Sequence, residues 1–224
     1  MPRLARRNVP FRDRFDAGRQ LGQRLERYAR RPDVLVLGLP RGGVPVAFEV
    51  ARALGAPLDV FLVRKLGAPG HEELAMGAVA SGGVRVLNRE VVEVLLVPER
   101  VIEELASQEL REVERRQRSY RGDRPPPDAR DRTVILVDDG VATGSTMRAA
   151  AQAVRLLAPA RLVVGVPVAP PETCRALASE VDEVVCLATP EPFYGVGLWY
   201  ADFSPTTDTQ VRELLERARS AQAT

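Results

Sequence analysis

The segment Val134-Ile-Leu-Val-Asp-Asp-Gly-Val-Ala-Thr-Gly-Ser-Thr146 determines how the rest of the chain is interpreted. It opens with four apolar residues, mostly β-branched, a run typical of a buried parallel strand. Two acids and a turn of small residues follow, and beyond them apolar residues recur at helical spacing. The segment therefore predicts a strand, an acidic tip, a tight loop and a helix. In open α/β sheets, ligands bind beyond the carboxyl ends of the strands, where this order places the two carboxylates.

The residue types in the loop indicate the chemistry of a ligand. Thr143, Ser145 and Thr146 bring hydroxyls, and with free backbone N–H groups at a helix N-terminus they suit a phosphate monoester. Gly140 and Gly144 allow tight turns and close approach of a ligand. The two carboxylates just upstream can accept hydrogen bonds from vicinal hydroxyls. A phosphate site beside acceptors for a diol suits a ribose 5-phosphate.

Along its whole length the segment resembles the PRPP-binding motif of type I phosphoribosyltransferases, PRPP being phosphoribosyl pyrophosphate. The resemblance implies that a nitrogenous base displaces pyrophosphate from C1 of PRPP, with Mg²⁺ on the pyrophosphate. It also implies that Asp138 and Asp139 are catalytic, hold the ribose hydroxyls and reach the metal only through PRPP and water. The residues implied to bind the 5-phosphate are Ala142, Thr143, Gly144, Ser145 and Thr146. An ordinary βα turn with Ser and Thr caps is the alternative interpretation.

A second strand–loop–helix unit lies near the start of the chain. An apolar strand is predicted over 34–37, and it enters the glycine-rich run Gly38-Leu-Pro-Arg-Gly-Gly43. By the resemblance, this run holds the pyrophosphate, through Pro40, Arg41, Gly42 and Gly43. The guanidinium of Arg41 suits a polyphosphate, although on its own such a loop is more often a plain turn. The chain has no Walker pattern and no complete dinucleotide fingerprint, which disfavours a kinase or a dehydrogenase.

A third strand is predicted over 58–63, and it ends at two consecutive cations, Arg64 and Lys65. The resemblance implies that a basic residue here reaches the PRPP phosphates, so both are candidate pyrophosphate ligands and Lys65 is a candidate catalytic residue. For Arg64, a solvated surface charge is an equally good interpretation. Lys65 is the only lysine among 32 basic residues, which favours a functional role.

Residues 66–83 are rich in glycine and other small residues, and we expect them to form a long flexible loop. A connection of this length inside a compact domain is usually a functional lid or an insert, and type I enzymes close such a loop over PRPP. Glu73 is the candidate proton donor on it. Beyond the loop, a helical region is predicted from Asn88 to about residue 118, with an interruption near Pro98.

The region from 189 to 205 is expected to form a small hood over the base. It contains five aromatic residues between 193 and 203. Aromatic rings beyond the last strand can stack on a flat base, but they can equally plug the end of the sheet as core. On the first interpretation, the base-binding residues are Tyr194, Trp199, Tyr200 and Asp202.

The chain as a whole suits one domain over residues 1–224, with its core at about 34–188. The resemblance implies an α/β, Rossmann-like fold of three layers, with a mainly parallel sheet and helices on both faces. A net charge of +2 does not indicate nucleic-acid binding, and no apolar run is long enough to span a membrane. Cys174 and Cys186 have neither metal-ligand spacing nor the density of a disulfide-rich domain, so we expect a cytoplasmic protein. The sequence leaves open whether the protein forms a homo-oligomer.

Two other functions are compatible with the same pattern: a PRPP or nucleotide sensor without turnover, and an α/β scaffold whose acidic strand tip is incidental. The acceptor base is not identified by the residues. In the hypoxanthine-guanine branch of the family, the position before Thr-Gly carries an aspartate that assists at the purine ring. Here that position is Ala142, so we expect hypoxanthine and guanine to be poor acceptors.

Overall fold

The computed structural model describes residues 10–222, apart from the side chains of residues 72 and 73. Its centre is a parallel sheet with the strand order β2-β1-β6-β7-β8. The strands are β1 (Val34–Gly38), β2 (Leu58–Val60), β6 (Thr133–Val137), β7 (Arg161–Val168) and β8 (Glu183–Ala188). All five residues of β1 and of β6 are buried, as expected for strands covered on both faces.

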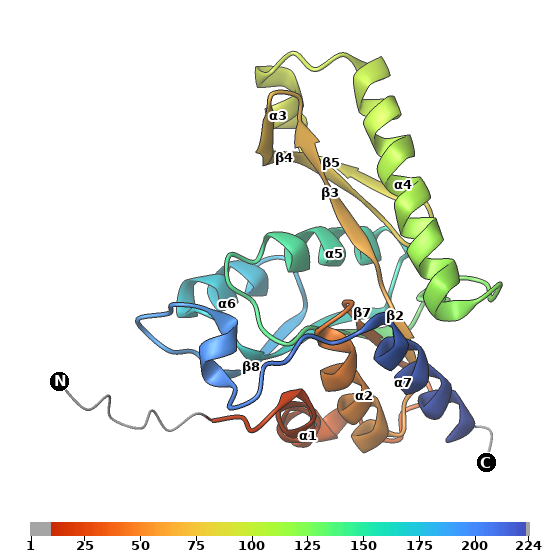
Figure 1. Cartoon of the computed structure of the whole chain (residues 1–224), viewed down its shortest axis with the longest axis vertical. Helices are drawn as coiled ribbons and strands as arrows, with labels where there is room; N and C mark the ends of the chain where they lie inside the picture. Colours follow the sequence, from red (N-terminus) through yellow and green to blue (C-terminus); the bar gives the residue numbers. More distant parts are fainter. Residues whose placement is uncertain (1–9, 223–224) are drawn as a thin grey trace.

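Helices cover both faces of this sheet (Figure 1). One face packs against α1 (Arg14–Arg24), α2 (Gly43–Leu54) and α7 (Asp208–Ser220); the other packs against α5 (Ser145–Arg155) and α6 (Pro171–Ala178). Alternate residues of each strand belong to different cores: Ile135 and Val137 join the first, while Val134 and Leu136 join the second. Two short 3₁₀ helices, Glu26–Tyr28 and Val196–Trp199, complete these layers. The predicted three-layer α/β fold is therefore confirmed.

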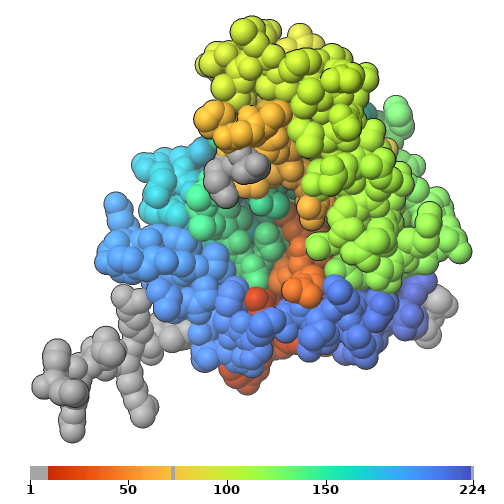
Figure 2. All heavy atoms as spheres, turned by 45° about the horizontal axis from the view of Figure 1, so that its top comes forward, coloured from red at the N-terminus to blue at the C-terminus, as the bar shows by residue number. Residues whose placement is uncertain are grey.

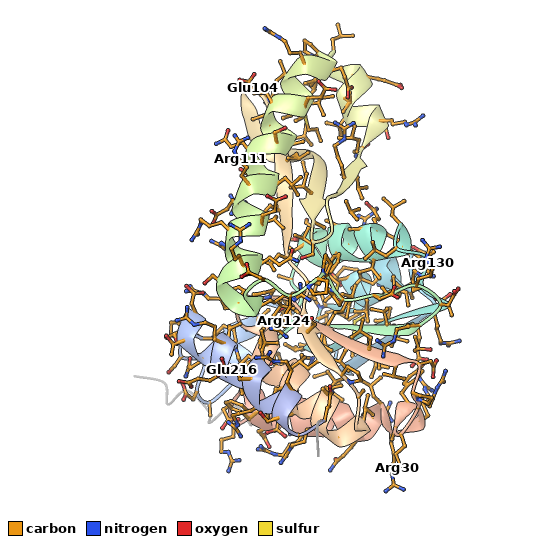
Figure 3. The ribbon with its side chains drawn as sticks, turned by 90° about the vertical axis from the view of Figure 1, so that its right-hand side faces the viewer. Arg30, Glu104, Arg111, Arg124, Arg130 and Glu216 are labelled. Atoms are coloured by element: carbon orange, nitrogen blue, oxygen red, sulfur yellow. A yellow bond between two sulfur atoms is a disulfide. The ribbon has the colours of Figure 1, made fainter. Side chains whose placement is uncertain are left out.

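The part of the chain that connects β2 to β6 forms a second, antiparallel sheet, which projects from the central layers (Figure 1). It consists of β3 (Val63–Ala68), β4 (His71–Ala80) and β5 (Val84–Leu87), followed by α3 (Arg89–Val94) and the long α4 (Glu99–Arg121). We call residues 63–121 the arm. The predicted interruption of the helical region near Pro98 is present, because Pro98 is the N-cap of α4. The charged side of α4 faces solvent, with Glu104 and Arg111 pointing away from the arm sheet (Figure 3).

The arm is joined firmly to the central layers. Arg121 at the end of α4 makes a buried bidentate ion pair with Asp59 of β2, at 2.8 and 2.9 Å. Leu66, Met76 and Ile102 of the arm belong to the same buried cluster as the inner residues of α2. Because the arm shares a core with the sheet, it is not a separately packed unit.

The segment expected to be a loop has regular structure instead. Residues 66–83 include most of the β3–β4 hairpin, and the predicted strand over 58–63 is divided between β2 and β3. The interruption falls at Phe61 and Leu62, which are buried in different clusters, because here the chain leaves one sheet for another. Whether the hairpin moves when ligand binds stays a prediction.

The two cysteines are paired in the structure. Cys174 of α6 and Cys186 of β8 form a disulfide, which the spacing in the sequence does not predict. Low cysteine content argues against a disulfide-rich domain, but it does not exclude a single bridge between neighbouring elements. Within residues 10–222, no helix is both long and apolar enough to cross a membrane.

Candidate active site

The two acids of the central motif lie at the carboxyl end of β6, in the middle of the sheet. The glycine-rich loop after β1 lies directly beside them. A Cβ atom on Gly43 would come within 2.8 Å of the Asp138 Cα, and one on Gly42 would come within 2.0 Å of the Asp139 Oδ2. Only glycine permits this approach, so both glycines keep the loop packed on the acid pair. The Pro40–Arg41 peptide bond in this loop is cis.

The loop after the acids leads into α5 as the sequence predicts. Gly144 has a left-handed backbone with φ +82° and caps the helix. Within the described chain, the amides of Ser145, Thr146 and Met147 have no protein acceptor, as expected for the first turn of a helix. The hydroxyls of Thr143 and Ser145 are 3.2 Å apart and exposed. This end of α5 therefore presents N–H and O–H donors to the space above the sheet, a suitable arrangement for a phosphate.

Thr173, which the sequence does not identify as a site residue, fixes this loop from the side of α6. The Thr173 hydroxyl of α6 donates to the carbonyl oxygen of Ala142 at 2.7 Å, which orients the predicted phosphate-binding loop at residues 142–146, called the phosphate loop below. Its methyl group lies 3.1 Å from where a Cβ on Gly144 would be. Threonine at a helix start is too common for the sequence to reveal this contact.

The acid pair is electrostatically unusual. Burial raises the pKa of Asp138 well above its usual range, and the adjacent Asp139 charge raises it further. Burial also raises the pKa of Asp139, although the guanidinium of Arg14 opposes this effect. Asp138 is partly exposed to the space above the sheet but is surrounded by protein on its other sides. Two neighbouring carboxylates in such surroundings favour binding of a cation or of hydroxyl donors.

Arg14 is the second residue that the sequence analysis misses. Its Nε donates to the Asp139 Oδ2 at 2.7 Å, although 125 positions separate the two residues. Arginine accounts for 31 of the 32 basic residues, so no local signal distinguishes this one. Helix α1, far from the central motif in the sequence, therefore supplies a side chain to the site.

The remaining candidate cations are placed differently from one another. Arg41 of the glycine-rich loop is half-exposed, and its Nη1 lies 3.9 Å from the Asp208 Oδ1 at the start of α7. Arg64 and Lys65 point to opposite faces of β3, because successive strand residues alternate. Arg64 pairs with Glu109 of α4, whereas Lys65 is exposed and lines a cavity of about 590 Å³. Only Lys65 of the two faces the phosphate loop.

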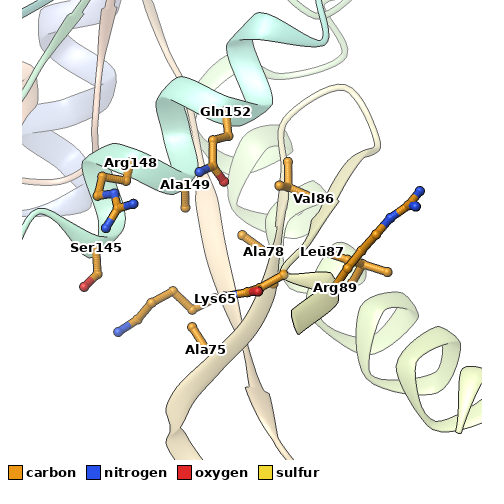
Figure 4. A pocket seen from close by; sticks show the side chains of 12 residues that line it. Lys65, Ala75, Ala78, Val86, Leu87, Arg89, Ser145, Arg148, Ala149 and Gln152 are labelled. Atoms are coloured by element: carbon orange, nitrogen blue, oxygen red, sulfur yellow. The ribbon is translucent and has the colours of Figure 1, made fainter. Parts of the chain in front are cut away.

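The cavity lies between the arm sheet and the first turns of α5 (Figure 4). The Lys65 ammonium extends toward the same end as Ser145 and Arg148, while Gln152 and small residues line the middle. The figure shows Arg89 directed away from this group. Figure 2 shows a hollow bounded by the arm, α5, the glycine-rich loop and the C-terminal segment. The cavity forms its arm side.

The C-terminal aromatics divide between two situations. Tyr200 is buried; it packs against Phe11 and Phe203, and its hydroxyl donates to the backbone oxygen of Asp139. Burial raises the pKa of Tyr200. For this residue the core interpretation holds, because a ring enclosed in a cluster presents no face to a base. Tyr194 is 69% exposed. Trp199 is partly buried near Tyr200.

Asp202 is exposed, and its carboxylate is occupied locally. One oxygen accepts from the backbone N–H and the hydroxyl of Ser204, which lowers the pKa of Asp202. This is the arrangement of a residue that shapes its own turn. The side chain of Glu73, the predicted proton donor, lies outside the described residues.

The described side chains of the site suit a Mg²⁺ ion that is bound together with substrate phosphates. Among the side chains described, no group of three or more His, Cys, Asp or Glu residues could hold a metal ion. One of the two acids is already paired with Arg14. Mg²⁺ is commonly held by one or two carboxylates together with substrate phosphates and water. Asp138 and Asp139 suit that indirect arrangement.

Comparisons with known proteins agree with this geometry. Residues 13–191 match the model of the family described as "Phosphoribosyl transferase domain". The chain is 47% identical over 208 residues to a Mycobacterium tuberculosis protein named "Putative phosphoribosyl transferase Rv0571c". That alignment covers 93% of this chain but 47% of the relative, so the chain spans about half the length of the curated relatives it matches.

A solved structure resembles the whole fold. The crystal structure of TT1426 from Thermus thermophilus has a TM-score of 0.84 and 45% sequence identity, and the match covers 92% of this chain and 98% of that one. The strand order, the acids at the end of β6 and the match to the family model all lead to the same assignment. The chain belongs to the phosphoribosyl transferase family of enzymes.

Proposed function

We propose that this protein transfers the phosphoribosyl group of PRPP to a nitrogenous base in a Mg²⁺-dependent reaction that releases pyrophosphate. One observation supports this above all others. The glycine-rich loop, the acid pair and the donor-rich start of α5 meet at one edge of the sheet. A molecule with a phosphate at one end, a diol in the middle and a pyrophosphate beside it matches these three parts.

Each part has a separate task in the proposed complex. The amides and hydroxyls of residues 142–146 bind the 5-phosphate, and Asp138 accepts hydrogen bonds from the ribose hydroxyls. The loop at residues 40–43 and Lys65 contact the pyrophosphate. Mg²⁺ bound together with the substrate would neutralise charge on the leaving group. The aromatic segment at 193–203 and the arm bound the space for the base.

In the reaction, a ring nitrogen of the base forms a bond to C1 while the bond from C1 to the pyrophosphate oxygen breaks. The electron pair of that bond leaves with pyrophosphate, and the proton of the attacking nitrogen passes to solvent or to a nearby base. Positive charge develops on the ribose as negative charge develops on the leaving group. Donors fixed in advance on the pyrophosphate stabilise that separation more than water does. The sequence places Glu73 in the arm as the candidate for proton transfer.

The proposal is tested first by binding. PRPP with Mg²⁺ should raise the melting temperature, because a ligand that binds only the folded state adds about 2.7 kcal/mol at a concentration 100 times its Kd. Asp138→Asn should reduce this shift. Asp33→Asn is the matched control, because Asp33 precedes β1 at the opposite edge of the sheet. Equal shifts for the unmodified protein and Asp138→Asn would contradict the site assignment.

Turnover is tested by pyrophosphate release with PRPP, Mg²⁺ and a panel of purine, pyrimidine and pyridine bases. Release that depends on one base supports the transferase reaction. PRPP binding without release by any base would support a PRPP sensor. Absence of PRPP binding would favour a scaffold.

A further inference from the structure

The two acids of the site are not equivalent, and Arg14 makes the difference. Arg14 is the first residue of α1, and its side chain is 10% exposed. A cation is disfavoured at the positive end of a helix dipole, so a buried arginine there requires compensating partners. Arg14 has three: the Asp139 carboxylate at 2.7 Å, the Ser204 carbonyl oxygen at 2.7 Å, and the Phe203 ring, 3.9 Å from the guanidinium carbon.

Asp139 is held at both its side chain and its backbone. Its Oδ2 accepts from Arg14, and its carbonyl oxygen accepts from the Tyr200 hydroxyl. The same Oδ2 lies where the glycine-rich loop comes closest, since a Cβ on Gly42 would be 2.0 Å from it and 3.2 Å from the Arg14 Nε. The Arg14–Asp139 pair is thus the surface on which the pyrophosphate loop lies.

The Asp138 carboxyl is held by its neighbour instead, because it hydrogen-bonds both the backbone N–H and the side chain of Asp139. Its Oδ1 accepts from the Asp139 backbone N–H at 2.8 Å. In the part of the chain that the structure describes, no cation pairs with its carboxylate. Of the two acids, Asp138 is therefore the one without a guanidinium partner, and its partly exposed carboxyl remains accessible to a ligand.

We propose that Arg14 is a positioning residue for PRPP, which immobilises Asp139 beneath the pyrophosphate loop and leaves Asp138 to accept the ribose hydroxyls. This inference rests on the proposed function and divides the acid pair into a support and a ligand. Through Ser204 and Phe203, Arg14 also ties the C-terminal segment to the same support. On this proposal the two acids, both predicted to hold the ribose hydroxyls, would have different roles.

A double-mutant cycle on PRPP affinity tests this, with Kd measured by calorimetry in Mg²⁺. The variants are Arg14→Met, Asp139→Asn and the pair of substitutions together. If Arg14 acts through Asp139, the two effects are coupled, and residues in contact typically show coupling of roughly 2- to 150-fold. Arg14→Lys should recover part of the affinity, because it keeps the charge but loses the planar fork.

Two further variants make the result decisive. Arg14→Met alone leaves a buried carboxylate unpaired; the double variant removes both charges, so it provides folded protein if the single variant does not fold. Arg155→Met breaks an Arg–Asp pair at the far end of α5, 2.9 Å from Asp182, and should leave the Kd unchanged.

Coupled losses with normal binding by Arg155→Met would support the assignment. Additive effects of Arg14→Met and Asp139→Asn would overturn it, because Arg14 would then act on PRPP without Asp139. A Kd for Asp138→Asn equal to that of the unmodified protein would also overturn it. If the unmodified protein binds no PRPP, the proposed function fails and this inference fails with it.

Discussion

Two neighbouring residues of like charge have different surroundings in this protein, because the strand that carries them directs their side chains to opposite faces. Arg64 and Lys65 are consecutive, but β3 directs Arg64 to Glu109 and Lys65 to the cavity beside α5. The ion pair with Glu109 raises the pKa of Arg64. A sequence alone shows two cations in a row, whereas the register of the strand separates their functions.

This separation gives a direct prediction. Lys65→Met should weaken PRPP binding at least about tenfold, since a hydrogen bond to a charged group contributes about 1.5–3 kcal/mol. Arg64→Met should leave PRPP affinity unchanged and alter stability by less than about 1 kcal/mol, because the Glu109 pair is partly exposed. Calorimetry and denaturant unfolding check the two effects. A larger loss of PRPP affinity in Arg64→Met than in Lys65→Met would show that Arg64, and not Lys65, faces the ligand in the complex.

The acid pair should make stability depend on pH. Burial raises the pKa of Asp138, so this carboxyl binds a proton more tightly in the folded state than in the unfolded state. The free energy of unfolding therefore falls as pH rises from the usual pKa of an aspartate to the raised pKa. Without ligand and with chelator present, Asp138→Asn should therefore melt higher than the unmodified protein at pH 8, and by a smaller margin at pH 5.

Asp33 supplies the control of opposite sign. Arg31 and Thr133 lower the pKa of Asp33 to about 2, so its contribution is present above its usual pKa and is lost as pH falls toward 2. Asp33→Asn should therefore lower the melting temperature at pH 8. A melting temperature for Asp138→Asn below that of the unmodified protein at pH 8 would mean that its carboxylate is favourably solvated.

Much of the site follows from the sequence because its parts are local. Residues 134–146 form a strand, a turn and a helix start within 13 positions, and their order alone defines the donors and acceptors. The contacts that Arg14, Thr173 and Tyr200 make with the site could not be predicted in the same way, because each depends on tertiary structure. The aromatic segment was open to two interpretations, and for Tyr200 burial decides between them.

At the scale of elements, the arm is where sequence reasoning was least successful. Its β4 strand contains Ala75, Gly77, Ala78 and Ala80, residues that suggest a loop. A Cβ on Gly77 would lie 2.4 Å from the Val86 carbonyl oxygen, so the close approach of β5 requires glycine inside a strand. Small residues here serve strand packing, which composition does not distinguish from flexibility.

The hairpin nevertheless remains the predicted lid over the substrate. If it closes, PRPP with Mg²⁺ should slow cleavage between residues 66 and 83 by a nonspecific protease by about threefold or more. Contacts with the ligand would raise the free energy of local opening, and a rise of about 1.4 kcal/mol already lowers the open population tenfold. Mass spectrometry of the fragments locates the cuts. Cleavage within α4 is the internal control, and equal rates in the hairpin with and without ligand would argue against closure.

At the scale of the whole molecule, the proposed reaction is limited by a proton-transferring group that the phosphate loop lacks. Ala142, at the exposed tip of the phosphate loop, cannot exchange a proton with a base. General acid–base assistance typically contributes about 10²–10⁴ in rate. Hypoxanthine and guanine should therefore be used at least about 100-fold less efficiently than the true acceptor.

Steady-state kinetics with the base identified in the pyrophosphate-release screen checks this ranking. Ala142→Asp supplies a matched variant and should narrow the gap for hypoxanthine. Efficient use of hypoxanthine by the unmodified protein would show that another residue supplies the proton transfer.

The contact of Arg14 with Ser204 spans 190 positions, and this has a consequence for synthesis. At about 5–20 residues per second, roughly 10–40 s pass between the appearance of the two partners at the ribosome. In about the last third of that interval the nascent chain already contains the phosphate loop, but the Arg14 contact to Ser204 has not yet formed. We expect substrate to protect the nascent chain from proteases only after residue 204 has left the ribosomal tunnel, so a segment that is made late decides when the earlier residues can bind substrate.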